Sequence, residues 1–296
     1  MRKITVLLLS LISTGAVVLS YVALTIQEPI EEDTDTIKIA AFNIQVFGRA
    51  KRQKEDVMDI LTSIVREVDL ILIQEIRDSS EETIPLFLQK INDLEGPKYQ
   101  YIRSERLGRS MSKEAYAYLY NTETIEFIYE SDFVYDDVYD VFEREPYIAS
   151  FVSGNFDFTI IGIHIKPDDA YSEMGNLTNV IDFVLLENPN ELDTIIMGDF
   201  NADGTYFDEN DLTNPLKSSD FYWVITNEMD TMTKTAYSYD RIVLLNATYD
   251  HEYVEDSASV FKFDTKYDII NQTLVWEVSD HYPIYAEFKT DLVDDD

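Results

Sequence analysis

Residues 195–204, Ile-Ile-Met-Gly-Asp-Phe-Asn-Ala-Asp-Gly, place a carboxylate and an amide where a buried strand should end. The apolar run 195–197 predicts a buried strand, and Gly198 lets the backbone turn without a Cβ atom. Asp199 and Asn201 follow two positions apart, so in extended geometry both side chains lie on the same face. A carboxylate and an amide there suit water activation and binding of a phosphate oxygen. The alternative is an Asx-rich turn that closes the strand.

Polar side chains also interrupt or follow two earlier apolar runs. Asn43 lies inside the predicted strand 38–46, where an amide without a partner would cost about 1–3 kcal/mol. The predicted buried strand 69–74 leads into a cluster of charges, which is typical of reactive sites in open α/β sheets. Glu75 in this cluster is a candidate ligand for a hard cation such as Mg²⁺. A surface ion pair between Glu75 and Arg77 is the alternative.

The chain has 3 histidines, and two of them lie beside candidate reactive groups. His164 falls in the predicted strand 156–165, and His281 directly follows Asp280. A histidine titrates near neutrality, so it can move protons or, when cationic, stabilise an anionic oxygen. Two imidazoles with strand-end carboxylates and two asparagines fit a site for phosphodiester hydrolysis. A metal and one cationic imidazole would neutralise developing charge, while the second imidazole or a carboxylate positions water. A purely structural role for each histidine is the alternative.

The elements that must position these groups alternate along the chain. Apolar residues at helical spacing predict helices over 55–67, 83–94 and 171–186. Apolar runs predict further strands over 115–120, 147–152, 242–245 and 284–288, with a strand hairpin over 124–139. This alternation indicates a layered α/β or α+β fold. Because 45% of the residues are apolar and no linker rich in Gly, Ser or Pro interrupts residues 37–290, we expect one domain there.

The two ends of the chain differ from this body. A basic start precedes residues 4–26, which carry no charge. That length suits either a cleaved secretory signal or an uncleaved membrane anchor, so residues 1–27 predict a protein that is secreted, or attached to a membrane and facing outside. Residues 28–36 are predicted to be an acidic linker and residues 291–296 an acidic tail. The absence of cysteine excludes disulfides and a lipid anchor on cysteine.

The net charge is −34, from 57 acidic and 23 basic residues. Such acidity opposes binding to a polyanion in general, so any nucleic-acid site depends on where the bases lie. The bases cluster at 49–54 and at 98–113; the second segment holds Lys98, Arg103, Arg106, Arg109 and Lys113. The cluster at 98–113 predicts a local anion-binding surface on an otherwise acidic protein.

A charge this far from zero also predicts that stability depends on salt. The Debye length, the distance over which charges still repel one another, is about 3 Å at 1 M salt and about 30 Å at 0.01 M. We therefore hypothesise a saline or ion-rich environment, and expect the midpoint of thermal unfolding to rise between low and high salt. Equal midpoints at the two salt concentrations would contradict this hypothesis.

Taken in chain order, these segments resemble the deoxyribonuclease I family of the endonuclease/exonuclease/phosphatase superfamily. The matching segments within residues 37–289 are IAAFNI (39–44), LIQEIRD (72–78), LGR (107–109), KE (113–114), REP (144–146), His164, MGDFNAD (197–203), YDRIV (239–243) and SDHYP (279–283). The segments around residues 199 and 281 mark the superfamily, whereas those around residues 75 and 144 point to the deoxyribonuclease I branch.

The resemblance implies a fold, a reaction and a set of ions. The fold would be a four-layer sandwich of the α/β (α+β) class, in which helices flank two packed mixed β-sheets and the site lies at one edge. The protein would be an exported, monomeric endonuclease that hydrolyses phosphodiester bonds in DNA with Mg²⁺ or Mn²⁺. A Ca²⁺ ion would be structural.

The resemblance also assigns roles to residues by motif. It implies catalytic roles for His164 oriented by Glu114, His281 oriented by Asp240, and Asp199 with Asn201. It implies that the catalytic metal is bound by Glu75, Asp280 and Asn43. It implies a Ca²⁺ loop formed by Asp230, Thr231, Thr233 and Thr235. It implies DNA contacts by Arg77, Arg144, Arg109 and Tyr239. For the Ca²⁺ loop, a solvated turn is the alternative.

The chain departs from the family pattern at a few positions. Gly204 stands where vertebrate members have a cysteine, Ser112 where an aromatic residue stacks, and Ala115 where a base follows the conserved glutamate. These departures concern stability, DNA affinity and cleavage preference. Two other functions stay open: a phosphodiesterase of the same superfamily that acts on phospholipids or inositol phosphates, and a catalytically inactive relative that binds actin or DNA.

Overall fold

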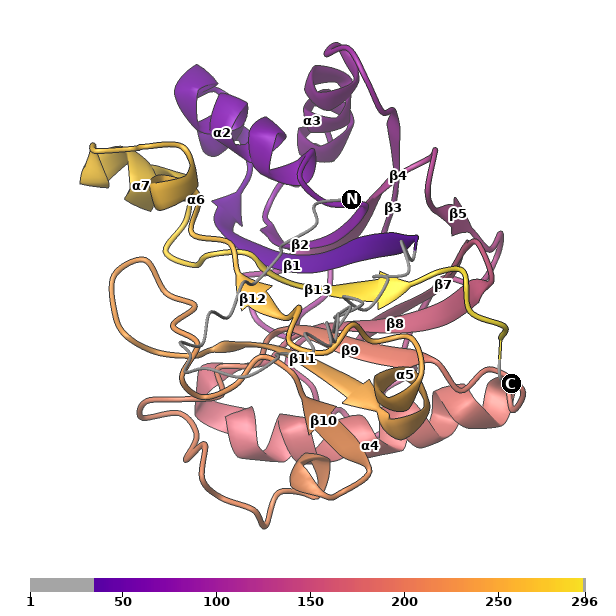
Figure 1. Ribbon diagram of the computed structural model, residues 1–296. Helices are drawn as coiled ribbons and strands as arrows, with labels where there is room; N and C mark the ends of the chain where they lie inside the picture. Colours follow the sequence, from indigo (N-terminus) through magenta and orange to yellow (C-terminus); the bar gives the residue numbers. More distant parts are fainter. Residues whose placement is uncertain (1–34, 295–296) are drawn as a thin grey trace, which may run out of the picture. The chain divides into compact units, whose positions relative to one another are not determined.

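The computed structural model describes residues 35–294, in which the apolar runs form two β-sheets (Figure 1). The first sheet has the strand order β12-β13-β1-β2-β4-β3. Its strands are β1 (Thr36–Phe47), β2 (Leu70–Ile76), β3 (Tyr99–Arg103), β4 (Ala115–Asn121), β12 (Ser259–Val260) and β13 (Ile284–Lys289). β1 and β2 are parallel, whereas β1 and β13 are antiparallel, so this sheet is mixed.

The second sheet has the order β10-β11-β9-β8-β7-β5, and β6 also pairs with β7. Its strands are β5 (Glu126–Phe127), β6 (Phe133–Val134), β7 (Tyr147–Ser153), β8 (Phe156–His164), β9 (Thr194–Asp199), β10 (Phe221–Trp223) and β11 (Asp240–Leu245). Here β8 and β9 are parallel and the neighbouring pairs are antiparallel. Both sheets therefore contain one parallel pair at their centre.

Helices cover the outer faces of the two sheets, as Figure 1 shows. The first sheet packs against α2 (Glu55–Val65), α3 (Thr83–Asn92), α6 (Phe263–Lys266) and α7 (Gln272–Val278). The second packs against α4 (Ala170–Glu187). Between the sheets lies a third cluster of buried apolar side chains contributed by both, including Leu72 and Tyr118 from the first and Phe158 and Met197 from the second. The predicted four-layer sandwich is confirmed. The remaining helices are short: α1 (Arg49–Arg52), α5 (Asn246–Asp250) and two 3₁₀ turns, η1 (Pro167–Asp169) and η2 (Pro215–Lys217).

The predicted hairpin over 124–139 is wrong. β5 and β6 have two residues each, and both pair with β7 rather than with each other. Their aromatic side chains explain the difference. Phe127 packs on Phe151 between the sheets with ring centroids 5.7 Å apart, whereas Phe133 packs on Phe183 of α4 at 6.0 Å. Each aromatic ring packs against a different layer, so the two short strands separate.

The predicted segment 1–27, nearly all of the linker 28–36 and the last two residues of the tail lie outside the described residues. Among residues 35–294, no helix has the length and apolarity needed to cross a bilayer.

One edge of the sandwich gathers the polar strand ends. Asn43 of β1 lies opposite Gln74 of β2. In the second sheet, Asp199 of β9 lies between His164 of β8 and Asp240 of β11. The Asn43 Nδ2 donates a hydrogen bond to Asp199 Oδ2 at 3.0 Å, which joins the two sheets at this edge. This bond brings together two residues that lie 156 positions apart in sequence.

Candidate active site

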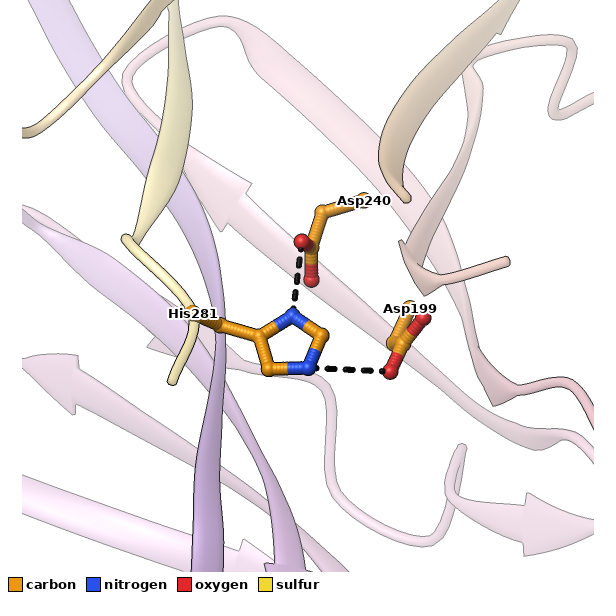
Figure 2. Close-up of side chains that lie close together, drawn as sticks. All are labelled: Asp199, Asp240 and His281. Atoms are coloured by element: carbon orange, nitrogen blue, oxygen red, sulfur yellow. Dashed lines mark hydrogen bonds and ion pairs between the residues drawn. The ribbon is translucent and has the colours of Figure 1, made fainter. Parts of the chain in front are cut away.

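Two buried imidazoles face one carboxylate oxygen. The Nε2 atom of His164 lies 3.4 Å from Asp199 Oδ2, and that of His281 lies 3.5 Å from the same atom. The opposite ring nitrogens are also bound: His164 Nδ1 lies 2.6 Å from Glu114 Oε1, and His281 Nδ1 lies 2.8 Å from Asp240 Oδ2. Figure 2 shows His281 held between Asp240 and Asp199. Each ring is therefore fixed by its own carboxylate and presents Nε2 toward a shared one.

The charges of these groups support one another. Burial opposes a cationic imidazole, but the carboxylates of Asp240 and Asp199 outweigh it and raise the pKa of His281 to about 10. Against the same opposing burial, Glu114 raises the pKa of His164. The pKa of Asp199 is lowered although burial acts in the other direction, because His281 and His164 stabilise its anion. The imidazole of His281 is therefore cationic at neutral pH, and the pKa of His164 is shifted in the same direction.

Neighbouring polar groups hold Asp199 in place. The Asn201 N–H donates to Asp199 Oδ1 at 3.0 Å, and the Asn201 Nδ2 donates to the carbonyl of Ile165 at 2.9 Å. Gln74, which the sequence analysis did not single out, is fully buried. Its Oε1 accepts from the Asp199 N–H at 3.1 Å, and its Nε2 donates to Ile163 O at 2.6 Å. A polar residue inside a buried strand, the signal used for Asn43, would have identified Gln74 as well.

The residues predicted to bind the catalytic metal lie beside this pair of imidazoles. Glu75 Oε1 accepts from Asn43 Nδ2 at 3.3 Å, and its Oε2 accepts from the Val46 N–H at 2.9 Å. Asp280 Oδ2 accepts from Gln45 Nε2 at 2.6 Å, and its Oδ1 lies 3.9 Å from His281 Nε2. Both carboxylates keep part of their surface open, with side-chain exposures of 13% and 25%. Partly open carboxylates are oxygen donors that suit Mg²⁺ or Mn²⁺, so these residues fit such an ion.

The backbone around these carboxylates is strained. Gln45, Val46 and Glu75 have φ angles of +30°, +54° and +57°. A positive φ is unfavourable for residues other than glycine, and most of all for a β-branched residue such as Val46. The hydrogen bonds from Val46 N–H and Gln45 Nε2 to the two carboxylates hold the strained turn. Strain of this kind is typical of pre-organised binding sites.

A second group could also hold an ion: ligand atoms of Asp199, Asp240 and His281 all lie within 4.8 Å of one another. In the structure, however, His281 Nδ1 is bound to Asp240, and Asp199 already accepts from Asn201 and Asn43. This arrangement fits a fixed imidazole between two carboxylates.

Two arginines predicted to contact DNA surround Glu114 instead of extending into solvent. Arg77 Nη2 lies 3.1 Å from Glu75 Oε2 and 3.5 Å from Glu114 Oε2. Arg144, 6% exposed, donates from Nε to His164 O at 3.0 Å, and the same Nε lies 3.5 Å from Glu114 Oε1. Within the described range, Arg77 Nε and Arg144 Nη2 are buried without a hydrogen-bond partner. These unused donors lie beside the imidazole site.

Arg109 and Tyr239 differ in how near they lie to the imidazoles. Arg109 is bound to the segment before Arg144: its Nη1 donates to Asp140 O at 2.7 Å. The structure does not bring Arg109 into contact with the imidazoles or their carboxylates in the part of the chain it describes. Tyr239 directly precedes Asp240, and its ring stacks on Tyr237 with centroids 5.3 Å apart. Burial, and then the neighbouring tyrosines, raise the pKa of Tyr239 to about 12, so its hydroxyl is protonated at neutral pH.

The predicted Ca²⁺ loop supports the site through hydrogen bonds. Thr231 Oγ1 accepts from the N–H groups of Tyr239 at 3.0 Å and Asp240 at 3.2 Å. Thr233 Oγ1 donates to Ser279 O at 3.0 Å. Thr235 is exposed, whereas Asp230 Oδ1 is buried without a partner among residues 35–294. Two of the four predicted ligands thus fix the segments that carry Asp240 and Asp280.

Two of the four bases at 49–54, Lys51 and Arg52, are bound within the fold, whereas Arg49 and Lys54 are exposed. Lys51 is buried, and its Nζ donates to Ile44 O at 2.7 Å and Val278 O at 2.8 Å, which ties β1 to the segment before Asp280. Burial lowers the pKa of Lys51 to about 8. Arg52 is paired with Asp78 at 2.6 Å. Lys51 and Arg52 therefore hold neighbouring segments of the fold together.

Glu173 is a further buried residue that the sequence analysis missed. Its Oε1 accepts from the Glu143 N–H at 2.9 Å and its Oε2 from the Lys166 N–H at 3.1 Å. It therefore holds the residues next to Arg144 and just after His164 against α4. Burial raises its pKa from 4.5 to about 7.

We expect Glu173 to make stability fall as pH rises from about 5 to about 7. In this window the folded protein binds a proton at Glu173 that the unfolded chain has already released, so the free energy of unfolding decreases with pH. Urea unfolding of wild type and Glu173→Gln at pH 5 and pH 7.5 measures the effect. The decrease should be larger in wild type by about 2 kcal/mol. Equal decreases in both proteins would show that Glu173 does not titrate in this range.

Comparison with known proteins agrees with this geometry. Residues 40–281 match the Endonuclease/Exonuclease/phosphatase family. Deoxyribonuclease gamma from Mus musculus is 35% identical over 268 residues, which cover 87% of this chain and 85% of the relative. Deoxyribonuclease-1 from Bos taurus is 34% identical over 261 residues, which cover 84% of this chain and 91% of the relative.

Solved structures show the same fold at low sequence identity. An endonuclease/exonuclease/phosphatase family protein from Bacteroides thetaiotaomicron has a TM-score of 0.60 at 14% identity, covering 88% of this chain and 99% of that one. The human Nocturnin catalytic domain has a TM-score of 0.57 at 13% identity, covering 86% of this chain and 94% of that one.

Proposed function

Because the chain belongs to the endonuclease/exonuclease/phosphatase family and, within it, to the deoxyribonucleases, we propose that it is an exported, divalent-metal-dependent endonuclease that hydrolyses phosphodiester bonds in DNA. The observation that carries this proposal is the pair of buried imidazoles that face Asp199 Oδ2 at 3.4 and 3.5 Å. Export rests on the uncharged segment 4–26.

Hydrolysis proceeds by in-line attack of water on phosphorus, with one imidazole as base and the other as acid. Asp240 binds His281 Nδ1 and Glu114 binds His164 Nδ1, so in both rings Nε2 is the atom that exchanges a proton with the substrate. Asp199 and Asn201 orient the attacking water or the scissile phosphate. Arg77 and Arg144 keep Glu114 anionic, because their guanidinium groups, after His164, lower its pKa against the effect of burial.

Glu75 and Asp280, with Asn43 beside them, would hold the catalytic Mg²⁺ or Mn²⁺. When bound, such an ion neutralises charge on the phosphate oxygens during attack. The residues of the chain supply its position: the hydrogen bonds from Val46 N–H and Gln45 Nε2 fix the two carboxylates before any ion arrives. A structural Ca²⁺ at Asp230 and the adjacent threonines remains part of the proposal, supported by the buried, unpartnered Asp230 Oδ1.

DNA contacts are confined to a small part of a surface whose overall charge repels DNA. The unused donors Arg77 Nε and Arg144 Nη2 suit phosphate oxygens beside the imidazoles. Tyr239 adds a neutral hydroxyl donor, and Arg109 adds a base from the segment 98–113. We propose that the protein acts as a monomer.

A plasmid assay tests the proposed function. The purified full chain is incubated with supercoiled plasmid and Mg²⁺ plus Ca²⁺, with and without chelator, across salt concentrations. We expect conversion to open circles and then linear DNA, abolished by chelator. Parallel reactions with phospholipid vesicles and inositol phosphates should give no turnover. Metal binding without cleavage of DNA would instead indicate an inactive relative, and turnover of the lipid or inositol substrates would indicate the other phosphodiesterase class.

A further inference from the structure

A second group of buried acids lies at the opposite end of β9 from Asp199. Asp193 directly precedes β9, and Glu252 follows α5, in the region where Figure 1 places α5 beside the second sheet. Their exposed fractions are only 1% and 3%. Six residues of extended chain separate Asp193 from Asp199, which is about 20 Å. This group is therefore separate from the imidazole site.

Three oxygens in this group are buried without a hydrogen-bond partner. They are Asp193 Oδ1, Glu252 Oε2 and the Oγ1 of Thr248, a residue of α5 that has no exposed surface. The backbone groups around them are bound: the Asp193 carbonyl accepts from the Thr159 N–H at 2.8 Å, and that of Glu252 accepts from the Lys289 N–H at 2.8 Å. The fold thus fixes the backbone but leaves these side-chain oxygens without partners, at a cost of about 1–3 kcal/mol for each group.

The three side chains act on one another. The Thr248 hydroxyl and the Glu252 carboxyl are neighbours of the Asp193 carboxyl. Burial, and then the charge of Glu252, raise the pKa of Asp193 to about 9. His251 Nδ1 contacts Glu252 Oε1, the other oxygen of that carboxylate. In the part of the chain that the structure describes, no lysine or arginine forms an ion pair with Asp193 or Glu252.

We propose that Asp193, Glu252 and Thr248 form a Ca²⁺ site. Two carboxylates and a hydroxyl are hard oxygen ligands, and Ca²⁺ accepts such a mixed set in irregular geometry, with water and carbonyl oxygens completing its shell. Mg²⁺ demands near-octahedral geometry and loses its water reluctantly, so it suits this buried group less well. A proton shared between the carboxyls of Asp193 and Glu252 would bridge their two oxygens. It would still leave the Thr248 hydroxyl without a partner.

Bound Ca²⁺ at this position would connect the end of α5 to the start of β9. Because β9 carries Asp199 at its other end, the ion stabilises the strand without touching the reacting groups. The site is distinct from the predicted loop at Asp230, and its test does not depend on turnover of DNA.

Calcium binding to the full chain provides the test. Equilibrium dialysis gives the number of Ca²⁺ ions bound per chain for wild type, for Glu252→Gln and for Glu255→Gln, a matched control at an exposed position three residues away. Glu252→Gln should lose one ion per chain, and Glu255→Gln none. Without Ca²⁺, the midpoint of thermal unfolding of Glu252→Gln should equal or exceed that of wild type, because a facing charge is removed. With Ca²⁺, the midpoint should rise less than in wild type.

A second variant covers the case in which Glu252→Gln fails to fold. Thr248→Val keeps both carboxylates and removes only the hydroxyl ligand, so it should weaken Ca²⁺ binding at this site by about ten-fold, the equivalent of about 1.4 kcal/mol. If neither variant changes the number of bound ions or their affinity, the proposal is overturned and the carboxyl pair holds a proton instead.

Discussion

Replacement of His281 by alanine is expected to lower the rate of plasmid nicking by about 10³-fold at saturating Mg²⁺, since a positioned acid or base contributes about 10²–10⁴-fold. The substitution removes the Nε2 atom that faces Asp199 and leaves Asp240 buried, 1% exposed, without its imidazole partner. The loss should appear in kcat rather than in KM, because the imidazole acts on the transition state and not on DNA binding. Initial rates against DNA concentration measure both constants.

His251 supplies the matched control for this prediction, because it is the third histidine of the chain and contacts Glu252, away from the imidazole pair. His251→Ala should nick DNA at the wild-type rate under the same conditions. A His281→Ala protein as active as wild type would refute the mechanism assigned to the site, whereas loss of activity together with loss of the cooperative unfolding transition would be attributed to misfolding.

Replacement of Gly198 by alanine is expected to destabilise the protein by about 4 kcal/mol or more. A Cβ atom at Gly198 would lie 2.0 Å from Ile163 O and 2.7 Å from Gln74 Nε2, and the φ angle of +140° is unfavourable for alanine. Relief of the contact requires β8 and β9 to separate, and this breaks the hydrogen bond from Gln74 to Ile163. Urea unfolding followed by circular dichroism measures the free energy of unfolding, and failure to obtain folded protein is the extreme form of the same result.

Gly175 provides the comparison. It lies within α4, where a Cβ atom would be 3.4 Å from Pro215 Cδ, an ordinary contact. Gly175→Ala should therefore be neutral or stabilise the protein by up to about 1 kcal/mol, because alanine favours the helix. Similar losses of stability in the two variants would show that the close approach at Gly198 is not the cause.

The alternation of strands and helices was predictable because its signals are local, whereas the two-sheet sandwich followed from the resemblance to the deoxyribonuclease I family. The apolar runs of β1, β2, β8 and β9 are strong, and each leads into polar residues at the same edge. The prediction of a hairpin at 124–139 was wrong because the choice of pairing partner depends on which layer Phe127 and Phe133 pack against. That choice is a property of the whole sandwich and leaves no local pattern.

The reactive groups of the candidate site were predictable from the sequence. The residues that hold those groups in place were less so. Asp199 and Asn201 stand out because polar residues directly follow an apolar strand, and the structure brings both beside the imidazoles. Lys51 and Glu173 act by bonding to backbone atoms of distant segments, and a sequence contains no sign of which carbonyl or N–H a side chain will reach. The same limit applies to Arg52, whose acidic partner Asp78 lies 26 positions away in sequence.

Gln74 extends from the first sheet to the second, and this bridge has a consequence for how activity is lost. Each sheet carries one half of the reacting apparatus: Asn43 and Glu75 belong to one, His164 and Asp199 to the other. These residues form one site only while the two sheets stay aligned. A substitution that packs poorly between the sheets would shift one sheet laterally against the other. Activity would then be lost while every strand remained folded.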